Sequence, residues 1–136
     1  MVYLAIQIRQ NTASLRANNL REVIHSVATS YDRMTADPRD LTIYLKGRES
    51  SASLSLEERE RFWVLLAMQL GNCELIVDLN RNGLVKPGTY NAALRQLVVL
   101  LSKRGARELW EERKSLFADD FRAFVDSQLA ACETAA

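Results

Sequence analysis

The sequence contains few of the residues that cross-link a chain. Its two cysteines, Cys73 and Cys132, are too few and too oddly placed for a disulfide framework. We interpret both as free thiols, which fits a reducing compartment. Cys73 falls in the most apolar stretch and is expected to be buried, whereas Cys132 lies in a small-residue tail that we expect to fray.

Proline, glycine, histidine and net charge are equally sparse. Two Pro and five Gly among 136 residues favour helices joined by short loops. A net charge of +1 gives no general attraction to nucleic acid or to a bilayer. The chain has one histidine, no glycine-rich phosphate loop, no zinc-type Cys and His spacing and no nucleophile elbow. These absences argue against most enzyme classes.

What is present describes an ordinary globular chain. The apolar fraction of 48% and the charged fraction of 26% are typical of one domain, residues 1–136, with a real core. Apolar spacing follows the helical period, and we find no strand-like alternation and no long repeat. The sequence therefore predicts an all-α bundle of five or six helices.

The longest predicted helix covers about residues 4–34. Its apolar positions repeat every 3.5 residues for about four heptads, as in a helix packed along its length against another. An antiparallel neighbour in the same chain is the favoured partner, and a coiled coil with a second chain is the alternative. The stripe consists of Tyr3, Ile6, Ala13, Ala17, Leu20, Ile24, Val27, Tyr31 and Met34.

A short helix should follow, with Asp37 as its N-cap, Pro38 at its first position and Gly47 as its stop. Its expected inner face carries Leu41, Tyr44 and Leu45.

The third predicted helix covers about residues 56–82. Ser55 and Glu58 form a capping box at its start, and Gly83 is typical of a left-handed stop at its end. Thirteen of the eighteen residues from 62 to 79 are apolar, which indicates a central helix buried on several sides. A membrane span is the alternative, disfavoured by four interrupting polar residues, Gln69, Asn72, Glu74 and Asp78. We expect the first and third helices to form a long antiparallel hairpin.

Three further helices complete the prediction. Pro87 begins one that Gly105 breaks, residues 106–117 form a short one, and the last begins near Asp119. Inward positions are Tyr90, Ala93, Leu94, Leu97, Val98 and Leu101 on the first, Leu109, Trp110, Leu116 and Phe117 on the second, and Phe121, Phe124, Val125 and Leu129 on the last.

Residues 1–8 form an apolar tip on the first helix. As helix they would extend about 12 Å, well short of a hydrocarbon core of about 30 Å, and no secretory signal is present. We expect Tyr3, Ile6 and Ile8 to carry a membrane-proximal or self-association surface. Arg9, Arg16 and Arg21 would face anionic headgroups or solvent, since a positive flank marks the cytoplasmic side of a span.

Three segments resemble a group of uncharacterised bacterial proteins. They are residues 2–12, residues 55–62, and the closing run from Trp110 to Asp126 that contains Phe117 and Phe121. In that group an N-terminal transmembrane helix precedes an all-helical domain, and no catalytic residues are known. The resemblance implies that residues 1–8 finish a membrane helix and that Met1 is an internal start or an artificial boundary.

Two patterns suggest metal ligands. Residues 78–83 match the first half of a calcium loop through Asp78, Asn80 and Asn82, but Thr89 stands where a bidentate carboxylate is needed, so a plain helix end is favoured. Glu22 and His25 form one Glu-x-x-His step, whereas di-iron bundles use two.

Glu74 and Asp78 lie four residues apart and could act as an acid–base pair or as further metal ligands. We favour a structural role for these two carboxylates, with Arg21 or Arg95 as partner.

A basic cluster lies between residues 103 and 114, interleaved with Glu108, Glu111 and Glu112. Aromatic residues do not alternate through it, which favours a solvated helix face over nucleic-acid binding. Trp63 and Trp110 are expected to be core anchors.

The sequence as a whole predicts a non-catalytic helical domain that acts by protein–protein contact or self-association, with no cofactor and no nucleic acid. It would be tethered to the cytoplasmic side of the inner membrane. Two alternatives stay open. One is a metal- or small-molecule-binding bundle enzyme using Glu22, His25, Glu74 and Asp78. The other is a soluble helical homodimer with no membrane role.

Overall fold

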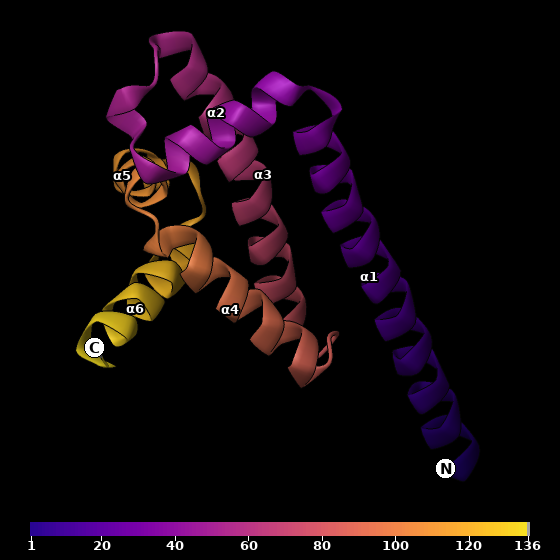
Figure 1. Cartoon of the computed structure of the whole chain (residues 1–136). Coiled ribbons are helices and arrows are strands. Elements are labelled where there is room, and N and C mark those ends of the chain that lie inside the picture. Colours follow the sequence, from indigo (N-terminus) through magenta and orange to yellow (C-terminus); the bar gives the residue numbers. More distant parts are fainter. Residues whose placement is uncertain (136) are drawn as a thin grey trace.

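The computed structural model describes residues 1–135, which form six α-helices, two short 3-10 turns and no strand (Figure 1). The predicted all-α bundle is confirmed. The elements are α1 (Val2–Ala36), α2 (Pro38–Glu49), η1 (Ser51–Ser53), α3 (Leu56–Arg81), α4 (Pro87–Ser102), α5 (Arg104–Arg113), η2 (Lys114–Leu116) and α6 (Asp119–Ala135).

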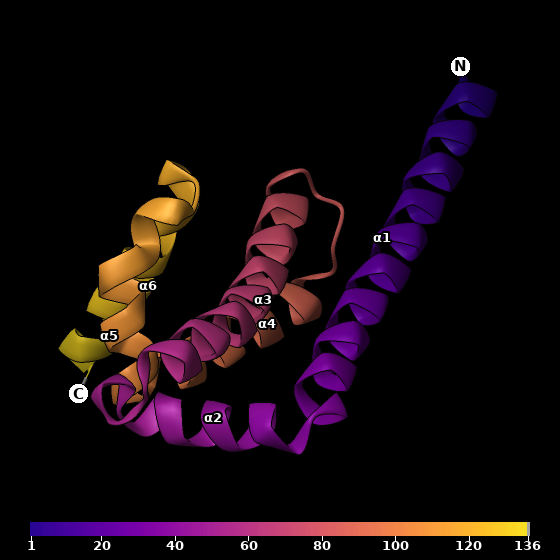
Figure 2. The same ribbon diagram turned by 90° about the horizontal axis from the view of Figure 1, so that it is seen from above.

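Helix α3 is the centre of the domain, with α1, α2 and α4 packed around it. Helix α1 runs antiparallel to α3, and its first half extends past the body of the domain (Figures 1 and 2). Among residues 1–135, α3 alone is long and apolar enough to cross a membrane, a test that a core helix also passes. Its buried side chains, including Phe62, Leu66 and Leu70, belong to the main core.

Local capping chemistry sets most helix ends as predicted. The Asp37 carboxylate accepts a hydrogen bond from the Arg39 amide at 2.9 Å, and Ser55 Oγ accepts one from the Glu58 amide at 3.3 Å. At the end of α3, Gly83 has φ +68°, and the amides of Gly83 and Leu84 donate back to the carbonyls of Asn80 and Leu79. This pair of bonds is a Schellman motif, for which glycine has no steric penalty.

Two glycines predicted to end helices lie inside them, so that prediction is wrong. Gly47 is buried within α2, and Gly105 is buried at the second position of α5. A Cβ on Gly47 would lie 2.7 Å from Cγ of Phe62, and one on Gly105 would overlap the carbonyl oxygen of Gly47. The two glycines therefore let the backbones of α2 and α5 touch where the helices cross.

The inner face of α2 also differs from the prediction. Ile43 and Tyr44 are buried, whereas Leu41 and Leu45 are exposed. Most inward positions of the later helices are buried as predicted, among them Leu97 and Leu101 of α4 and the α6 residues Phe121, Val125 and Leu129. Leu116 is an exception: α5 ends at Arg113, and Leu116 lies in η2 and is exposed, so its predicted inward position is wrong. The tail around Cys132, which we expected to fray, is part of α6.

Replacing Gly105 with alanine should destabilise the domain by about 3 kcal/mol, because the added methyl group forces α2 and α5 apart. Gly71→Ala is the matched control. Gly71 is an exposed residue inside α3 with nothing within 4 Å of an added Cβ. This control should stabilise the domain by about 0.5–1 kcal/mol through helix propensity. Urea unfolding of both variants measures the difference, and equal stabilities would contradict the close contact.

Candidate functional site

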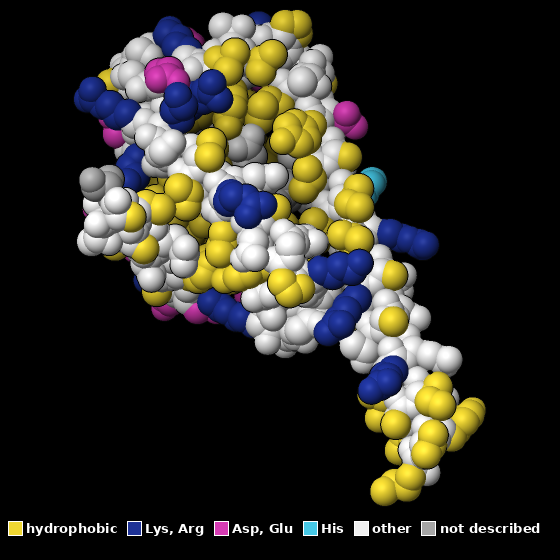
Figure 3. Space-filling model, turned by 60° about the horizontal axis from the view of Figure 1, so that its bottom comes forward, with side chains coloured by type: hydrophobic (Ala, Val, Ile, Leu, Met, Phe, Trp, Pro, Cys, Tyr) yellow, Lys and Arg dark blue, Asp and Glu magenta, His cyan; other side chains and the backbone are white. Residues whose placement is uncertain are grey.

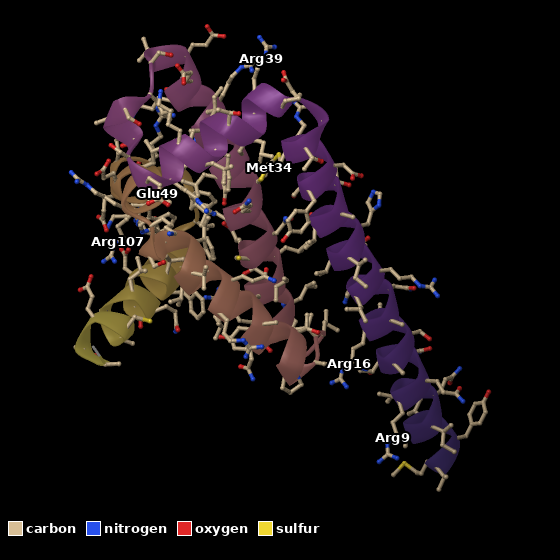
Figure 4. All side chains as sticks on the ribbon, viewed as in Figure 1. Arg9, Arg16, Met34, Arg39, Glu49 and Arg107 are labelled. Atoms are coloured by element: carbon tan, nitrogen blue, oxygen red, sulfur yellow. The ribbon has the colours of Figure 1, made fainter. Side chains whose placement is uncertain are left out.

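Helix α1 meets the rest of the domain through a narrow inner face near its C-terminal end. Val23 is buried against Ile76 of α3 and Ala93 of α4. Met34 joins the main core and points from α1 toward the body (Figure 4). Between them, Asn72 of α3 accepts a hydrogen bond from Ser26 and donates one to Ser30 at 2.9 Å. These side-chain hydrogen bonds therefore fix the axial position of α1 relative to α3.

The predicted apolar stripe of α1 does not face α3 along its length. Val27 is half-buried and Met34 is buried, but Ile24 and Tyr31 are each 60% exposed. Two causes act together. The part of α1 before Arg16 extends past the end of α3, and over the rest of the helix a 3.5-residue repeat drifts by about 20° per heptad, so the stripe turns toward α3 only near Met34. The exposed part forms an outer stripe, defined here as Tyr3, Ile6, Ala13, Ala17 and Ile24.

The tip of α1 projects from the domain with its apolar side chains uncovered. Tyr3, Ile6 and Ile8 are between 49% and 77% exposed. Arg9 lies on the projecting segment, whereas Arg16 reaches back and donates from Nε to the carbonyl of Gly83 at 2.9 Å (Figure 4). Arg16 thus braces the middle of α1 against the α3–α4 loop, while the segment before it has nothing beside it (Figure 3).

A groove opens beside the anchored half of α1. It measures about 460 Å³ and lies between α1, α2, α3 and α4. The sequence prediction missed it, because four helices contribute its walls. One signal was present: Gln69 and Asn72, noted as polar interruptions of the apolar third helix, both line it.

The candidate metal ligands are not brought together. Glu22 and His25 are exposed on α1, and residues 1–135 contain no group of three His, Cys, Asp or Glu side chains placed to hold a metal ion. Asn82 Nδ2 donates to the carbonyl of Asp78 at 2.9 Å. Together with the left-handed Gly83 this confirms that residues 78–83 are a helix end.

Glu74 and Asp78 share one side of α3 near α6. Burial, followed by the charges of Asp78 and Asp120, raises the pKa of Glu74 above its usual value. Asp78 lies 3.5 Å from Arg81, which also pairs with Asp120. Arg81 is therefore the partner of Asp78, where Arg21 or Arg95 was predicted, and the ion pairs of residues 1–135 do not include Glu74.

Ion pairs neutralise the basic cluster of residues 103–114. Its five cations each meet a carboxylate from another part of the fold or from the next turn: Lys103 with Glu49, Arg104 with Glu108, Arg107 with Glu133, Arg113 with Glu60 and Lys114 with Asp126. Two of these pairs tie α5 to α3 and α6, and the flanking residues Lys103 and Lys114 reach α2 and α6. The cluster thus serves the fold, and its charge is locally balanced.

Both tryptophans are anchors, as predicted. Trp110 is fully buried, and its Nε1 donates to Asp126 at 2.9 Å. Trp63 packs against the core, with the Arg113 guanidinium 5.4 Å from its ring centre.

The two cysteines should differ sharply in reactivity. Cys73 is buried, and this burial raises the pKa of its thiol to about 11, so at pH 7.5 it carries little thiolate, the reactive form. Cys132 is exposed. A maleimide should therefore label one thiol per native chain quickly and two in denaturant. The Cys132→Ser variant should lose the fast phase, and rapid labelling of both native thiols would contradict the burial.

No protein-family model, curated protein or solved structure matches this chain. The resemblance to bacterial membrane-anchored helical proteins accordingly stays a prediction.

Proposed function

We propose that this protein is an interaction domain that self-associates through the outer stripe of α1. The observation that carries the proposal is the outer stripe itself, whose five apolar side chains are exposed along an otherwise well-packed protein. Single exposed apolar residues are common, but a row of them along one side of a helix, interrupted only by Gln10 and the half-buried Leu20, is typical of a contact surface.

The spacing of the outer stripe specifies a helix as the partner. A repeat of 3.5 residues matches a second helix in a left-handed supercoil, in which the repeat stays on one side along the whole contact. Ala13 and Ala17 at the middle allow two backbones to approach closely. A second copy of α1 presents the same spacing, so a symmetric pair of α1 helices satisfies both surfaces.

The Ala17→Arg variant tests self-association. Sedimentation of the unmodified chain over a concentration series should show a monomer–dimer equilibrium, and Ala17→Arg should weaken it at least tenfold, about 1.4 kcal/mol, by placing two cations in the contact. Ala17 is exposed, so the fold and its melting temperature should be preserved.

Asn18→Arg is the matched control, because it adds the same charge one residue later on a different side of α1. This control should dimerise like the unmodified chain. A chain that stays monomeric at high concentration, or equal weakening by both variants, would overturn the proposal.

The apolar tip favours a second role, attachment to the cytoplasmic surface of a bacterial inner membrane. Val2, Leu4, Ile6 and Ile8 are exposed on the segment that projects beyond the domain, and Arg9 follows them. Such a sequence, in which apolar residues are followed by a cation, is typical of a segment that enters lipid and ends at the level of the anionic headgroups. In a parallel α1 pair, both tips would reach the same surface.

Vesicle flotation tests this attachment. Vesicles containing phosphatidylglycerol should carry the protein upward, and the Ile6→Glu/Ile8→Glu variant should lose most of this binding, because burying carboxylates in lipid is costly. Leu56→Glu is the control, since Leu56 is an exposed apolar residue at the start of α3. Flotation that is equal for all three proteins would exclude the tip as the attachment point.

A further inference from the structure

The groove beside α1 has the dimensions of a small-molecule site. Its volume of about 460 Å³ lies in the usual range of about 300–1,000 Å³ for such sites. The side chains that form its apolar surface come from three helices: Met34 from α1, Cys73 and Ile76 from α3, and Val99 and Leu100 from α4. Figure 3 shows apolar side chains gathered in a hollow beside α1, with Lys and Arg side chains at its border.

Four uncharged polar side chains of the groove are bonded to one another in two pairs. Tyr44 donates its hydroxyl to Gln69 Oε1 at 3.0 Å, and Asn72 donates to Ser30 at 2.9 Å. These hydrogen bonds join α2 and α1 to α3, so they fix the spacing of the three helices that form the walls of the groove. The groove is therefore formed before any ligand enters, which lowers the entropic cost of binding.

The charged residues that line the groove have one sign. They are Arg48, Arg95 and Lys103, and no Asp or Glu lines it. Glu49, labelled in Figure 4 at the end of α2, lies 3.3 Å from Lys103 and only within 3.8 Å of Arg48. Within residues 1–135 no carboxylate pairs with Arg95, which leaves its positive charge uncompensated.

The side chain of Arg48 also indicates that the groove lacks a hydrogen-bond acceptor. Its Nε is buried and makes no hydrogen bond within the described chain, while its guanidinium lies 6.0 Å from the ring centre of Tyr44. A buried donor without an acceptor is unfavourable, and an anionic oxygen in the groove would satisfy it with a strong, charge-assisted bond.

We propose that the groove binds an amphiphilic monoanion of the fatty-acid class. The aliphatic chain lies on Met34, Ile76 and Leu100, and the carboxylate meets Arg48 and Arg95. A cation of the same shape would be repelled by Arg48 and Arg95, with Glu49 offsetting only the charge of Lys103, and a neutral alcohol would leave the Arg48 Nε poorly satisfied. This site is separate from the outer stripe and does not depend on self-association.

Three dodecyl compounds test the proposal by calorimetry and thermal melting, the two ionic ones used below their micelle concentrations and 1-dodecanol below its solubility limit. Dodecanoate should bind one per chain and raise the melting temperature, since a ligand of the native state stabilises it. It should bind at least tenfold tighter than 1-dodecanol, and dodecyltrimethylammonium should not bind. Equal binding of dodecanoate and 1-dodecanol would overturn the recognition of an anion.

Variants locate the site. Arg95→Gln should weaken dodecanoate binding at least fivefold, and Lys86→Gln, an exposed cation outside the groove, should leave it unchanged. Val99 lines the groove yet is 65% exposed, so Val99→Trp should cover the groove and abolish binding without overpacking the core. Dodecanoate that binds Arg95→Gln and Val99→Trp as it binds the unmodified chain would overturn the proposal by placing the ligand elsewhere, such as on the α1 tip.

Discussion

The crossing of α2 and α5 at Gly47 and Gly105 sets the positions of α2 and of α1, which precedes it in the chain. With no Cβ on either residue, the backbones touch, and Phe62 of the central helix closes over the same point. Beside this contact, Ser51 of η1 hydrogen-bonds Glu108 of α5, so the turn after α2 is held as well. Since α1 leaves α2 at the Asp37–Pro38 corner, the crossing decides where α1 reaches α3.

The groove depends on the same crossing, because Tyr44 and Arg48 enter it from α2 and Lys103 enters it from the residue before α5.

Much of this fold was predictable because helix ends are local. Asp37 and Ser55 accept hydrogen bonds from amides two or three residues later, Gly83 adopts the left-handed conformation, and Pro87 lacks the N–H that a first helical position leaves unpaired. The structure has each of them in its predicted role. Gly47 and Gly105 were misassigned for the opposite reason. A glycine that ends a helix and a glycine that admits another backbone have the same local sequence signature, and only the partner helix distinguishes them. The inner face of α2 was also predicted incorrectly, because Ile43 joins the main core while Leu41 and Leu45 face outward.

The candidate site was less predictable, since its parts come from separate helices. The apolar repeat of α1 was correctly identified from the sequence, but the surface that it faces was not. A 3.5-residue spacing on a straight helix turns gradually away from any single neighbour. Near its C-terminal end the repeat faces α3 through Val27 and Met34, and earlier it faces solvent through Ala13, Ala17 and Ile24. One sequence pattern therefore supplies both an internal contact and an unpartnered surface. Three residues of the groove, Val27, Tyr31 and Met34, belong to the predicted stripe of α1, and two amides interrupt the apolar third helix, but no sequence pattern links these residues to those from α2 and α4.

The groove and the outer stripe are both built on α1, and this connects the two proposals thermodynamically. The inner face that holds α1 is narrow: Val23, Met34 and the Ser26–Asn72–Ser30 bonds carry it, with Arg16 as a brace. A segment with so few buried contacts is a natural candidate for local opening.

A ligand in the groove would contact α1 and α3 together and oppose this opening. If pairing of α1 helices requires α1 to stay docked, ligand and partner must strengthen each other by the same factor, because linkage is reciprocal. If pairing instead draws α1 away from α3, each must weaken the other. The sign of that coupling thus reports whether α1 associates as part of the domain or as a released arm.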